Sequence, residues 1–163
     1  MERISHPFQP VYNTDSKILI LGSFPSVKSR IGEFYYHHPQ NRFWKVISAL
    51  YKEQLPTSIE QKKELLLRNG IAVWDVIKSC EITGSADNSI KNIVPNDLSE
   101  ILKIADIKRI FVNGSTAYQL YTKYIFPKIG RDAVRLPSTS PANAACNVDR
   151  LLEDWTFIKK IMI

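Results

Sequence analysis

The sequence has only two cysteines in 163 residues, Cys80 and Cys146, and they lie too far apart to form a Cys-x-x-Cys motif. Zinc sites built from four thiolates and cysteine-bound iron–sulfur clusters are therefore excluded. The chain also has no segment near the ~20 consecutive apolar residues of a membrane-spanning helix, and its first residues lack the apolar centre of a secretion signal. We expect an intracellular, soluble protein of the cytoplasm that does not contact a membrane.

Nucleotide-binding and hydrolase motifs are missing as well. The chain contains neither G-x-G-x-x-G nor the Gly-Lys-Ser/Thr ending of a phosphate-binding loop. It has no G-x-S-x-G motif, and its three histidines all lie within the first 38 residues, which argues against a serine hydrolase triad. The neighbouring His37 and His38 point in opposite directions in an extended segment, which argues against a shared metal. We expect neither a metal nor a cofactor.

Positive charge is in moderate excess. Lys and Arg number 22 against 16 Asp and Glu, and the formal net charge is +6. Residues 1–52 hold seven of the basic side chains and three of the acidic ones. Such an excess attracts polyanions, although many proteins are basic without binding nucleic acid. The length and the ordinary hydrophobic content predict one domain, residues 1–163, which we expect to be a monomer.

Four short, almost continuously apolar runs alternate with helical patterns. The runs are typical of strands buried on both faces, and the alternation predicts an α/β fold, a three-layer α/β/α sandwich with a central four-stranded parallel sheet. The strands are expected at residues 17–21, 71–74, 109–112 and 133–136. The helices are expected at residues 42–51, at 58–69 with a Ser58/Gln61 capping box and a stop at Gly70, from Asn96 to Ala105, at 115–124, and from about Asp149 to Met162.

Ligands of such folds bind beyond the carboxyl ends of the strands. The segments that follow the four strands are GSFPS, DVIKSC, NGSTA and PSTSPANA, and we expect them to converge on one site. Their small residues and prolines suit rigid turns whose backbone amides approach an anion, and they equally suit loops that only turn. The polar turn GSADNSI, residues 84–90, is open to the same two interpretations.

The segment LGSFPSVKSRIGEFYYHHPQNRFWKVI, residues 21–47, carries the densest group of candidate site residues. Asn41 precedes a predicted helix, where its amide can hold a water molecule or simply cap the helix. Arg42 and Lys45 are expected to face phosphates.

Aromatic side chains and one carboxylate complete the candidates. Phe24, Tyr35 and Tyr36 can stack on a base or belong to the core. Asp75 ends the second predicted strand directly after a Trp, and it can accept hydrogen bonds from ring N–H groups, act as an acid or base, or cap a turn. Aromatic, polar and basic groups in one place suit a base carried on a phosphate backbone.

Five segments resemble one known family. LGSFPSVKSRIGEFYYHHPQNRFW, VWDVIKSC, GSADNSI, FVNGSTAY and LPSTSPANA together, in order from about Lys17 to Ala144, look like the hypoxanthine-DNA glycosylase (DNA-deoxyinosine glycosylase) branch of the uracil-DNA glycosylase superfamily. The resemblance implies a four-stranded parallel sheet between helices. It also implies an enzyme of base excision repair that flips a deaminated base out of DNA and hydrolyses its N-glycosidic bond with an activated water, leaving an abasic site. The expected partner is DNA that contains deaminated bases.

The resemblance also assigns roles to single residues. Asn41 matches the catalytic amide of the HPxN segment in the hypoxanthine branch. Phe24 stands where the best-known relatives have an Asp or Asn that serves the water, so here it is expected to contact the base instead. Asp75 stands where uracil-reading relatives have Asn. An ionised carboxylate accepts but does not donate, which favours the N1–H of hypoxanthine over the O4 of uracil.

Two loops are expected to bind the DNA backbone on either side of the flipped nucleotide. Their residues are Ser23, Ser26, Ser29 and Arg30 on one side, and Ser138, Thr139 and Ser140 on the other. Pro141, Ala142 and Asn143 are expected to form the wedge and leaving-group loop. In the motif LPSTSPANA, which contains this loop, Ser138 and Ala142 replace the His and the intercalating Leu of relatives. Backbone N–H groups, with Ser138 or Ser140, are expected to stabilise the departing base. No lysine stands at the matching positions, so neither a Schiff base nor strand cleavage is expected.

Three alternatives stay open on the sequence. The first is a uracil- or xanthine-DNA glycosylase of the same superfamily, because base preference can depend on one or two hydrogen bonds. The second is a non-catalytic binder of damaged DNA, which the loss of the polar residue at Phe24 suggests. The third is a hydrolase of small molecules on the same architecture.

Overall fold

The computed structural model describes residues 2–160, and its centre is a sheet of four parallel strands in the spatial order β3-β2-β6-β7. The strands are β2 (Ile18–Gly22), β3 (Ile71–Asp75), β6 (Arg109–Asn113) and β7 (Ala133–Leu136). Each lies within one residue of a predicted apolar run at both ends. The predicted parallel sheet is confirmed, and β2, whose five residues are all buried, pairs with β3 on one side and β6 on the other.

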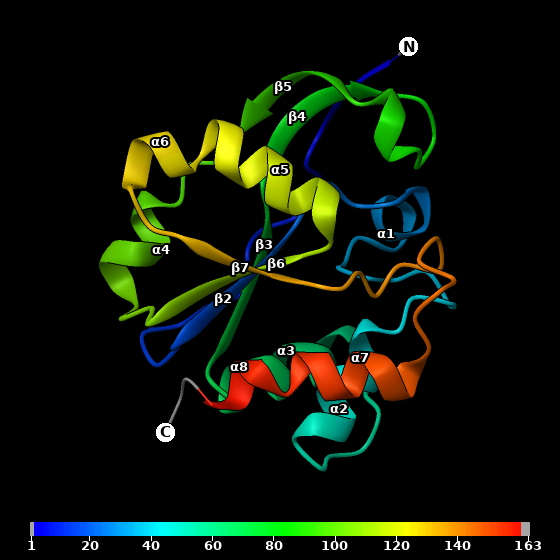
Figure 1. The fold of residues 1–163 in the computed structure, drawn as a ribbon, viewed down its shortest axis with the longest axis vertical. Helices are drawn as coiled ribbons and strands as arrows, with labels where there is room; N and C mark the ends of the chain where they lie inside the picture. Colours follow the sequence, from blue (N-terminus) through cyan, green and yellow to red (C-terminus); the bar gives the residue numbers. More distant parts are fainter. Residues whose placement is uncertain (1, 161–163) are drawn as a thin grey trace.

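Helices cover both faces of this sheet (Figure 1). One face carries α2 (Phe43–Leu50), α3 (Ile59–Arg68), α7 (Val148–Trp155) and α8 (Phe157–Lys160). The other carries α4 (Ser99–Ile104), α5 (Ser115–Tyr124) and α6 (Phe126–Ile129), while the short α1 (Val27–Gly32) lies beyond the ends of the strands. The three-layer sandwich is therefore confirmed. No helix between residues 2 and 160 is long and apolar enough to cross a lipid bilayer.

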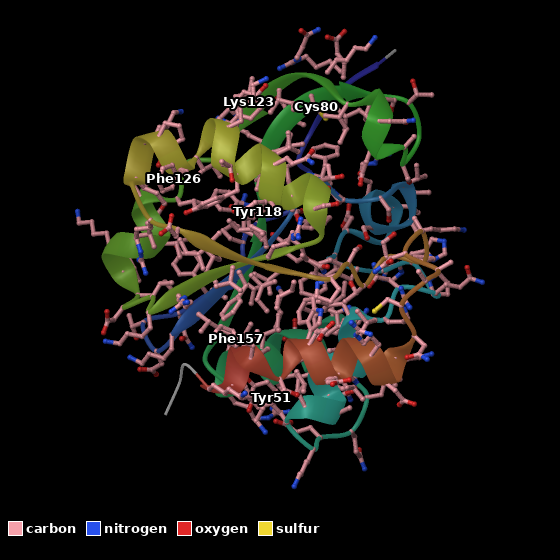
Figure 2. All side chains as sticks on the ribbon, in the orientation of Figure 1. Tyr51, Cys80, Tyr118, Lys123, Phe126 and Phe157 are labelled. Atoms are coloured by element: carbon pink, nitrogen blue, oxygen red, sulfur yellow. The ribbon has the colours of Figure 1, made fainter. Side chains whose placement is uncertain are left out.

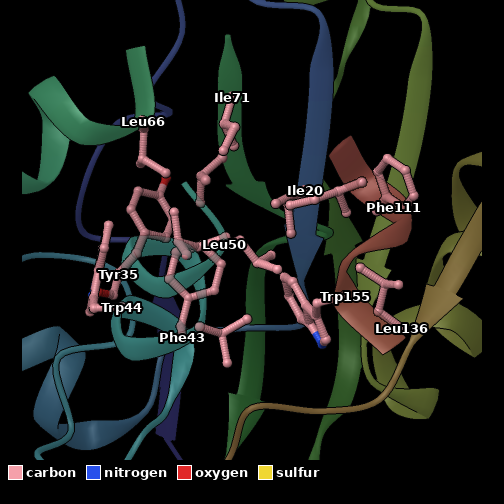
Figure 3. Packing of buried hydrophobic residues seen from close by; sticks show 14 of the residues in the cluster. Ile20, Tyr35, Phe43, Trp44, Leu50, Leu66, Ile71, Phe111, Leu136 and Trp155 are labelled. Carbon is pink, nitrogen blue, oxygen red and sulfur yellow. The ribbon is translucent and has the colours of Figure 1, made fainter. Parts of the chain in front are cut away.

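Alternate residues of β2 define two hydrophobic cores, because successive side chains of a strand point to opposite faces of the sheet. Ile18 and Ile20 belong to the core beneath α2, α3 and α7, where Figure 3 shows Ile20 beside the buried Trp155. Leu19 and Leu21 belong to the core beneath α4 and α5. Trp155 is fully buried and its indole N–H donates to the carbonyl oxygen of Pro137 at 2.9 Å, which fixes α7 to the loop after β7.

A second, antiparallel sheet was not predicted. It consists of β1 (Glu2–Ser5), β4 (Ile77–Ile82) and β5 (Lys91–Pro95) in the order β1-β4-β5, with a short 3-10 helix, η1 (Asp87–Ser89), before β5. The segment DVIKSC is therefore not a loop: after Asp75 the chain turns and continues as β4. Local composition does not reveal this sheet, because β1 pairs with residues more than 70 positions away in the sequence.

Two predicted helix signals are confirmed and one is wrong. The Ser58 hydroxyl accepts from the backbone N–H of Gln61 at 3.1 Å, and Gly70, with φ of 71°, follows the end of α3. Asn96 does not cap α4. Its side-chain amide donates to the carbonyl oxygen of Asp75 at 2.9 Å, so this residue supports the end of β3 instead.

The last helix also differs from the expectation. It begins at Val148, with Asn147 as its cap, and Thr156 separates it into α7 and α8. Leu151, Trp155 and Ile158 are buried, as the helical pattern predicted. Met162, which was expected on the same helix, lies outside the described residues.

Candidate active site

One cleft, with a volume of about 1200 Å³, opens at the carboxyl edge of the parallel sheet. All four segments that follow the strands contribute to its wall, although only Asp75 does so from the second segment. Ser85, Ala86 and Asp87 of the GSADNSI turn also line it. Phe157, on the opposite side of β7 from Tyr118 (Figure 2), lines the cleft as well. The predicted convergence on one site is therefore correct.

The loop after β2 brings Phe24 to the cleft wall. Its ring is half-buried, with the Arg30 guanidinium 5.7 Å from the ring centroid and the His6 ring edge-on at 6.0 Å. Arg30 also donates to the carbonyl oxygen of Gly84 at 2.6 Å. The guanidinium that was expected to bind phosphate is thus partly engaged within the protein, where it braces Phe24 against the 84–90 turn.

The three serines of this loop differ in their availability. Ser23 and Ser26 are half-buried and line the cleft. Ser29 is only 2% exposed, and its hydroxyl oxygen accepts from the backbone N–H of His37 at 3.0 Å and from the Ser26 hydroxyl at 3.2 Å. The Ser29 hydroxyl thus joins α1 to the following segment. Ser29 also lines the cleft, and its contact with the DNA backbone stays a prediction.

Asn41 lies at the cleft edge, immediately before α2. Its side-chain oxygen accepts from the backbone N–H of Phe43 at 2.9 Å, and the backbone N–H of Asn41 donates to the carbonyl oxygen of His38 at 2.9 Å. These bonds give the amide one orientation, so capping and water binding are compatible roles. His38 also lines the cleft, and its Nδ1 accepts from the backbone N–H of Gln40 at 3.1 Å, which leaves Nε2 as the donor.

The two tyrosines do not present their ring faces for base stacking. Tyr35 is 2% exposed in the core, and its hydroxyl donates to the carbonyl oxygen of Gln9 at 2.9 Å. Tyr36 stacks on Phe43 with ring centroids 4.1 Å apart, and its hydroxyl lines the bottom of the cleft near Gly22. Stacking of a base on these rings is therefore corrected, and Tyr36 offers a hydroxyl group instead.

Asp75 is paired with His6, a residue that no sequence motif points to. Nε2 of His6 lies 2.7 Å from Oδ2 of Asp75, and the two side chains are 4% and 6% exposed. β1 carries His6 to this position, because the backbone N–H of His6 continues the pairing with β4 by donating to the carbonyl oxygen of Lys78 at 2.7 Å. The residues are 69 positions apart, so no local pattern signals the contact.

The loop after β7 is held by Arg42, in place of the predicted phosphate contact. Its guanidinium donates to four carbonyl oxygens, those of Thr139 at 3.3 Å, Ser140 at 2.7 Å, Asn143 at 3.1 Å and Cys146. An arginine fork suits several acceptors at once, since it carries five N–H groups in a rigid plane. Arg42 therefore shapes the predicted wedge loop from within the protein.

Thr139 is also buried within this loop. It is 0% exposed and exchanges two hydrogen bonds of 3.0 Å with the side-chain amide of Asn113. Thr139 also lines the cleft, and its contact with the DNA backbone stays a prediction. Ser138 and Ser140 line the cleft, and their hydroxyl oxygens accept from the backbone N–H groups of Ser140 and Ala142 at 3.1 Å. Such serines keep a hydroxyl proton that can be donated to an anion.

The tip of the loop stands at the rim. Pro141 and Asn143 are half-buried and Ala142 is exposed, and all three line the cleft. The Asn143 amide donates to the carbonyl oxygen of Ser138 at 3.0 Å, which closes the loop on itself. Gly114, with φ of 99°, permits the close approach of this loop, because an added Cβ would lie 3.1 Å from Cβ of Ser138.

Among residues 2–160, no three His, Cys, Asp or Glu side chains are grouped so that they could hold a metal ion. The titratable groups at the bottom of the cleft act on one another instead. Burial, and next the charge of Asp75, raise the pKa of Tyr36, so its hydroxyl stays protonated at neutral pH. The same two causes raise the pKa of Tyr35 well above its ordinary value. The site thus combines a carboxylate acceptor with hydroxyl and amide donors.

Comparisons with known proteins agree with this geometry. The family described as the Uracil DNA glycosylase superfamily matches residues 9–160. A curated protein of Methanosarcina barkeri named Hypoxanthine DNA glycosylase is 33% identical over 138 residues, which cover 83% of this chain and 86% of that protein. Another of the same name, from Methanosarcina acetivorans, is 32% identical over 149 residues, 90% of this chain and 93% of that protein.

The fold agrees as well. A solution NMR structure from Methanosarcina acetivorans, described as a candidate uracil DNA glycosylase, matches with a TM-score of 0.81 at 30% identity and covers 96% of this chain and 97% of that one. The family match extends over most of the chain, and the curated relatives exceed 30% identity over most of their own length. The chain therefore belongs to the uracil DNA glycosylase superfamily.

Proposed function

We propose that this protein is a DNA glycosylase that removes hypoxanthine from deoxyinosine in DNA. The observation that carries the proposal is the presence of Asn41 and Asp75 in one cleft at the carboxyl edge of the sheet. Two relatives named Hypoxanthine DNA glycosylase support it. The flipped base would enter beside Phe24 and place its N1–H against the carboxylate of Asp75, which accepts but does not donate.

The chemistry is hydrolysis of the bond between N9 of the base and C1′ of the sugar. As that bond breaks, its electron pair moves to the base and the sugar develops positive charge at C1′. A water oriented by the Asn41 amide bonds to C1′, and the proton of the water neutralises the departing base. Backbone N–H groups of the cleft loops and the hydroxyls of Ser138 and Ser140 would stabilise the negative charge of the leaving group.

The DNA backbone would be held by the hydroxyls that the cleft exposes. These are Ser23, Ser26, Ser138 and Ser140, with Arg30 adding positive charge to one rim and the tip from Pro141 to Asn143 serving as the wedge. Within the described residues, the cleft is lined by no lysine, which supports a monofunctional enzyme that leaves an abasic site without cutting the strand. We further propose that the protein is a monomer, since one chain supplies the residues that line the cleft. We also propose that it is a single-domain, intracellular protein whose reaction needs neither a metal nor a cofactor.

The test is single-turnover release of base from matched duplexes that carry one deoxyinosine or one deoxyuridine, with alkaline cleavage of the abasic site as the readout. We expect hypoxanthine to be released, and we expect Asn41→Ala to abolish release while most of the DNA affinity remains. Faster release of uracil would keep the chemistry but overturn the base preference. Intact lesion binding without release of either base would make the protein a non-catalytic damage binder.

A further inference from the structure

The carboxylate of Asp75 has one oxygen engaged and one directed to the cleft. Oδ2 is bound by Nε2 of His6 at 2.7 Å in a buried pair. The backbone N–H of Phe8 reaches Nδ1 of the same ring at 3.4 Å, so Nδ1 is the acceptor and Nε2 carries the proton. His6 is therefore set to donate to Asp75, and it leaves Oδ1 as the acceptor that a ligand meets.

Oδ1 lies beside an unused donor. A Cβ added to Gly22 would lie 2.5 Å from Oδ1 of Asp75 and 3.1 Å from the hydroxyl oxygen of Tyr36, so both oxygens border the same small space. All three residues line the cleft. The Tyr36 hydroxyl is buried, and among residues 2–160 no group meets it with hydrogen-bond geometry. The Asn113 side chain lies near enough to oppose part of the rise in its pKa, but without that geometry it leaves the hydroxyl available to a ligand. A buried hydroxyl without a partner loses its hydrogen bonds to water and gains none in return, so its presence points to a ligand.

The position of this hydroxyl is held firmly. The Tyr36 ring stacks on Phe43 with an angle of 19° between the planes, and the backbone of Tyr36 adopts a left-handed conformation with φ of 54°. A non-glycine residue in that region is strained, and such strain concentrates at functional sites. The raised pKa of Tyr36 keeps the hydroxyl proton in place, so the group can donate to a ligand.

We propose that Tyr36 and the His6-bound Asp75 form a two-point reader for the lactam edge of a deaminated base. Hypoxanthine presents N1–H beside C6=O, a donor next to an acceptor, which matches the carboxylate and the hydroxyl in turn. Adenine presents the reverse pattern, and its N1, an acceptor, would face the carboxylate, which also only accepts; the 6-amino group would leave the Tyr36 hydroxyl proton without an acceptor. The reader therefore separates the deaminated base from its parent, and His6 is its positioning residue. This inference rests on the proposed function and extends it.

Uracil carries the same lactam pattern, N3–H beside a carbonyl group, and cytosine lacks it. Tyr36 and Asp75 thus define the class of substrate, deaminated bases, while the size and shape of the cleft select the purine from within that class. His6 matters because a carboxylate without a partner can rotate about its terminal torsion and bond the Tyr36 hydroxyl itself. That rotation would remove both the acceptor and the donor from the base.

The experiment compares Tyr36→Phe, His6→Leu and His6→Gln with the unsubstituted protein. Tyr121→Phe serves as the matched control, because its hydroxyl donates to the carbonyl oxygen of Arg131 and lies outside the cleft lining. Single-turnover excision of deoxyinosine is measured together with thermal unfolding. Binding is measured in the Asn41→Ala background, as the ratio of affinities for single strands that carry inosine or adenine, so that recognition is tested whether or not the protein is an enzyme.

Tyr36→Phe is expected to lower deoxyinosine excision and the inosine-to-adenine affinity ratio about tenfold each. Its melting temperature should stay the same or rise, since no group among residues 2–160 meets the removed hydroxyl with hydrogen-bond geometry. His6→Leu should lower the affinity ratio by a similar factor, and His6→Gln, which keeps an N–H donor, should restore most of it.

Unchanged excision and affinity ratio in Tyr36→Phe would overturn the reader, and equal defects in His6→Gln and His6→Leu would overturn the role of His6. Failure of the proposed function is a separate result. In that case the unsubstituted protein releases no base, while the affinity ratios still decide for or against the reader.

Discussion

Replacing Arg42 by Met tests whether this residue shapes the wedge loop or binds phosphate. Methionine keeps an unbranched chain of similar length but has no N–H groups. The substitution removes donors from the carbonyl oxygens of Ser140 at 2.7 Å, Asn143 at 3.1 Å and Cys146, and from the longer contact with Thr139. The three shorter bonds, each with a net value of about 1 kcal/mol after water replaces the arginine, predict a loss of about 3 kcal/mol.

That loss is measurable without abolishing the fold. A protein of this size has a total stability of about 5–15 kcal/mol, and a loss of about 3 kcal/mol lowers the melting temperature by roughly 6–12 °C. Urea unfolding gives the free energy directly, and hydrogen exchange should show faster exchange of the amides of residues 138–146. Lys45→Met, in the helix that Arg42 precedes, is the comparison variant. It removes an exposed charge, so the free energy of unfolding should change by less than about 0.5 kcal/mol.

DNA binding separates the two roles of Arg42 most clearly. A phosphate contact makes the slope of log affinity against log salt concentration more negative by about 0.9, whereas a side chain that bonds only to the protein does not change the slope. We therefore expect Arg42→Met to keep the salt slope while losing stability. A slope that becomes less negative by about 0.9, with the free energy of unfolding unchanged, would refute the reasoning and restore Arg42 as a phosphate contact.

Two further predictions concern the bottom of the cleft and the link between the end of α3 and the segment that follows α2. Gly22→Ala should lower deoxyinosine excision by more than tenfold, because the new Cβ would displace the carboxylate of Asp75, from which it would lie 2.5 Å; single-turnover rates at wild-type levels would contradict this. Glu53 accepts hydrogen bonds from Arg68 and Asn69, both at 2.8 Å, and these bonds lower its pKa from the ordinary 4.5. A lowered folded-state pKa means that the stabilisation is present above the unfolded value and is lost as the pH falls through the folded one. Urea unfolding should therefore show that Glu53→Gln destabilises the protein at pH 7 more than at pH 3, and an equal effect at both pH values would count against the link.

The parallel sheet could be predicted because its strands carry their own signal. β2 is buried on both faces, so the run from Ile18 to Leu21 has to be apolar throughout, and a helical pattern follows it. The antiparallel sheet could not be predicted in this way. β4 alternates buried and exposed residues, with Lys78 exposed and Cys80 buried, and its partner β1 is a short segment with few apolar residues. Only the pairing of distant segments makes these strands stable.

The candidate site, too, contains residues whose position could be predicted from the sequence and residues whose position could not. Asn41 and Asp75 could be selected from the sequence because each stands next to the end of a predicted element, where folds of this class place their ligands. Arg42, Ser29 and Thr139 carry donor groups that suit phosphate equally well, and composition alone does not tell where such groups point. In the structure all three bond within the protein.

The sequence by itself therefore determined the class of fold, the edge of the sheet where the cleft opens, and two polar residues that line the cleft, Asn41 and Asp75. These follow from periodicity and from the polarity of single residues, which are local properties of the chain. The tertiary structure alone decided that His6 fixes Asp75, that Tyr36 turns its hydroxyl to the cleft, and that Arg42 holds a loop about 100 residues away. Those contacts join segments that are distant in the sequence, and they depend on the direction in which each side chain leaves a backbone that only the complete fold positions.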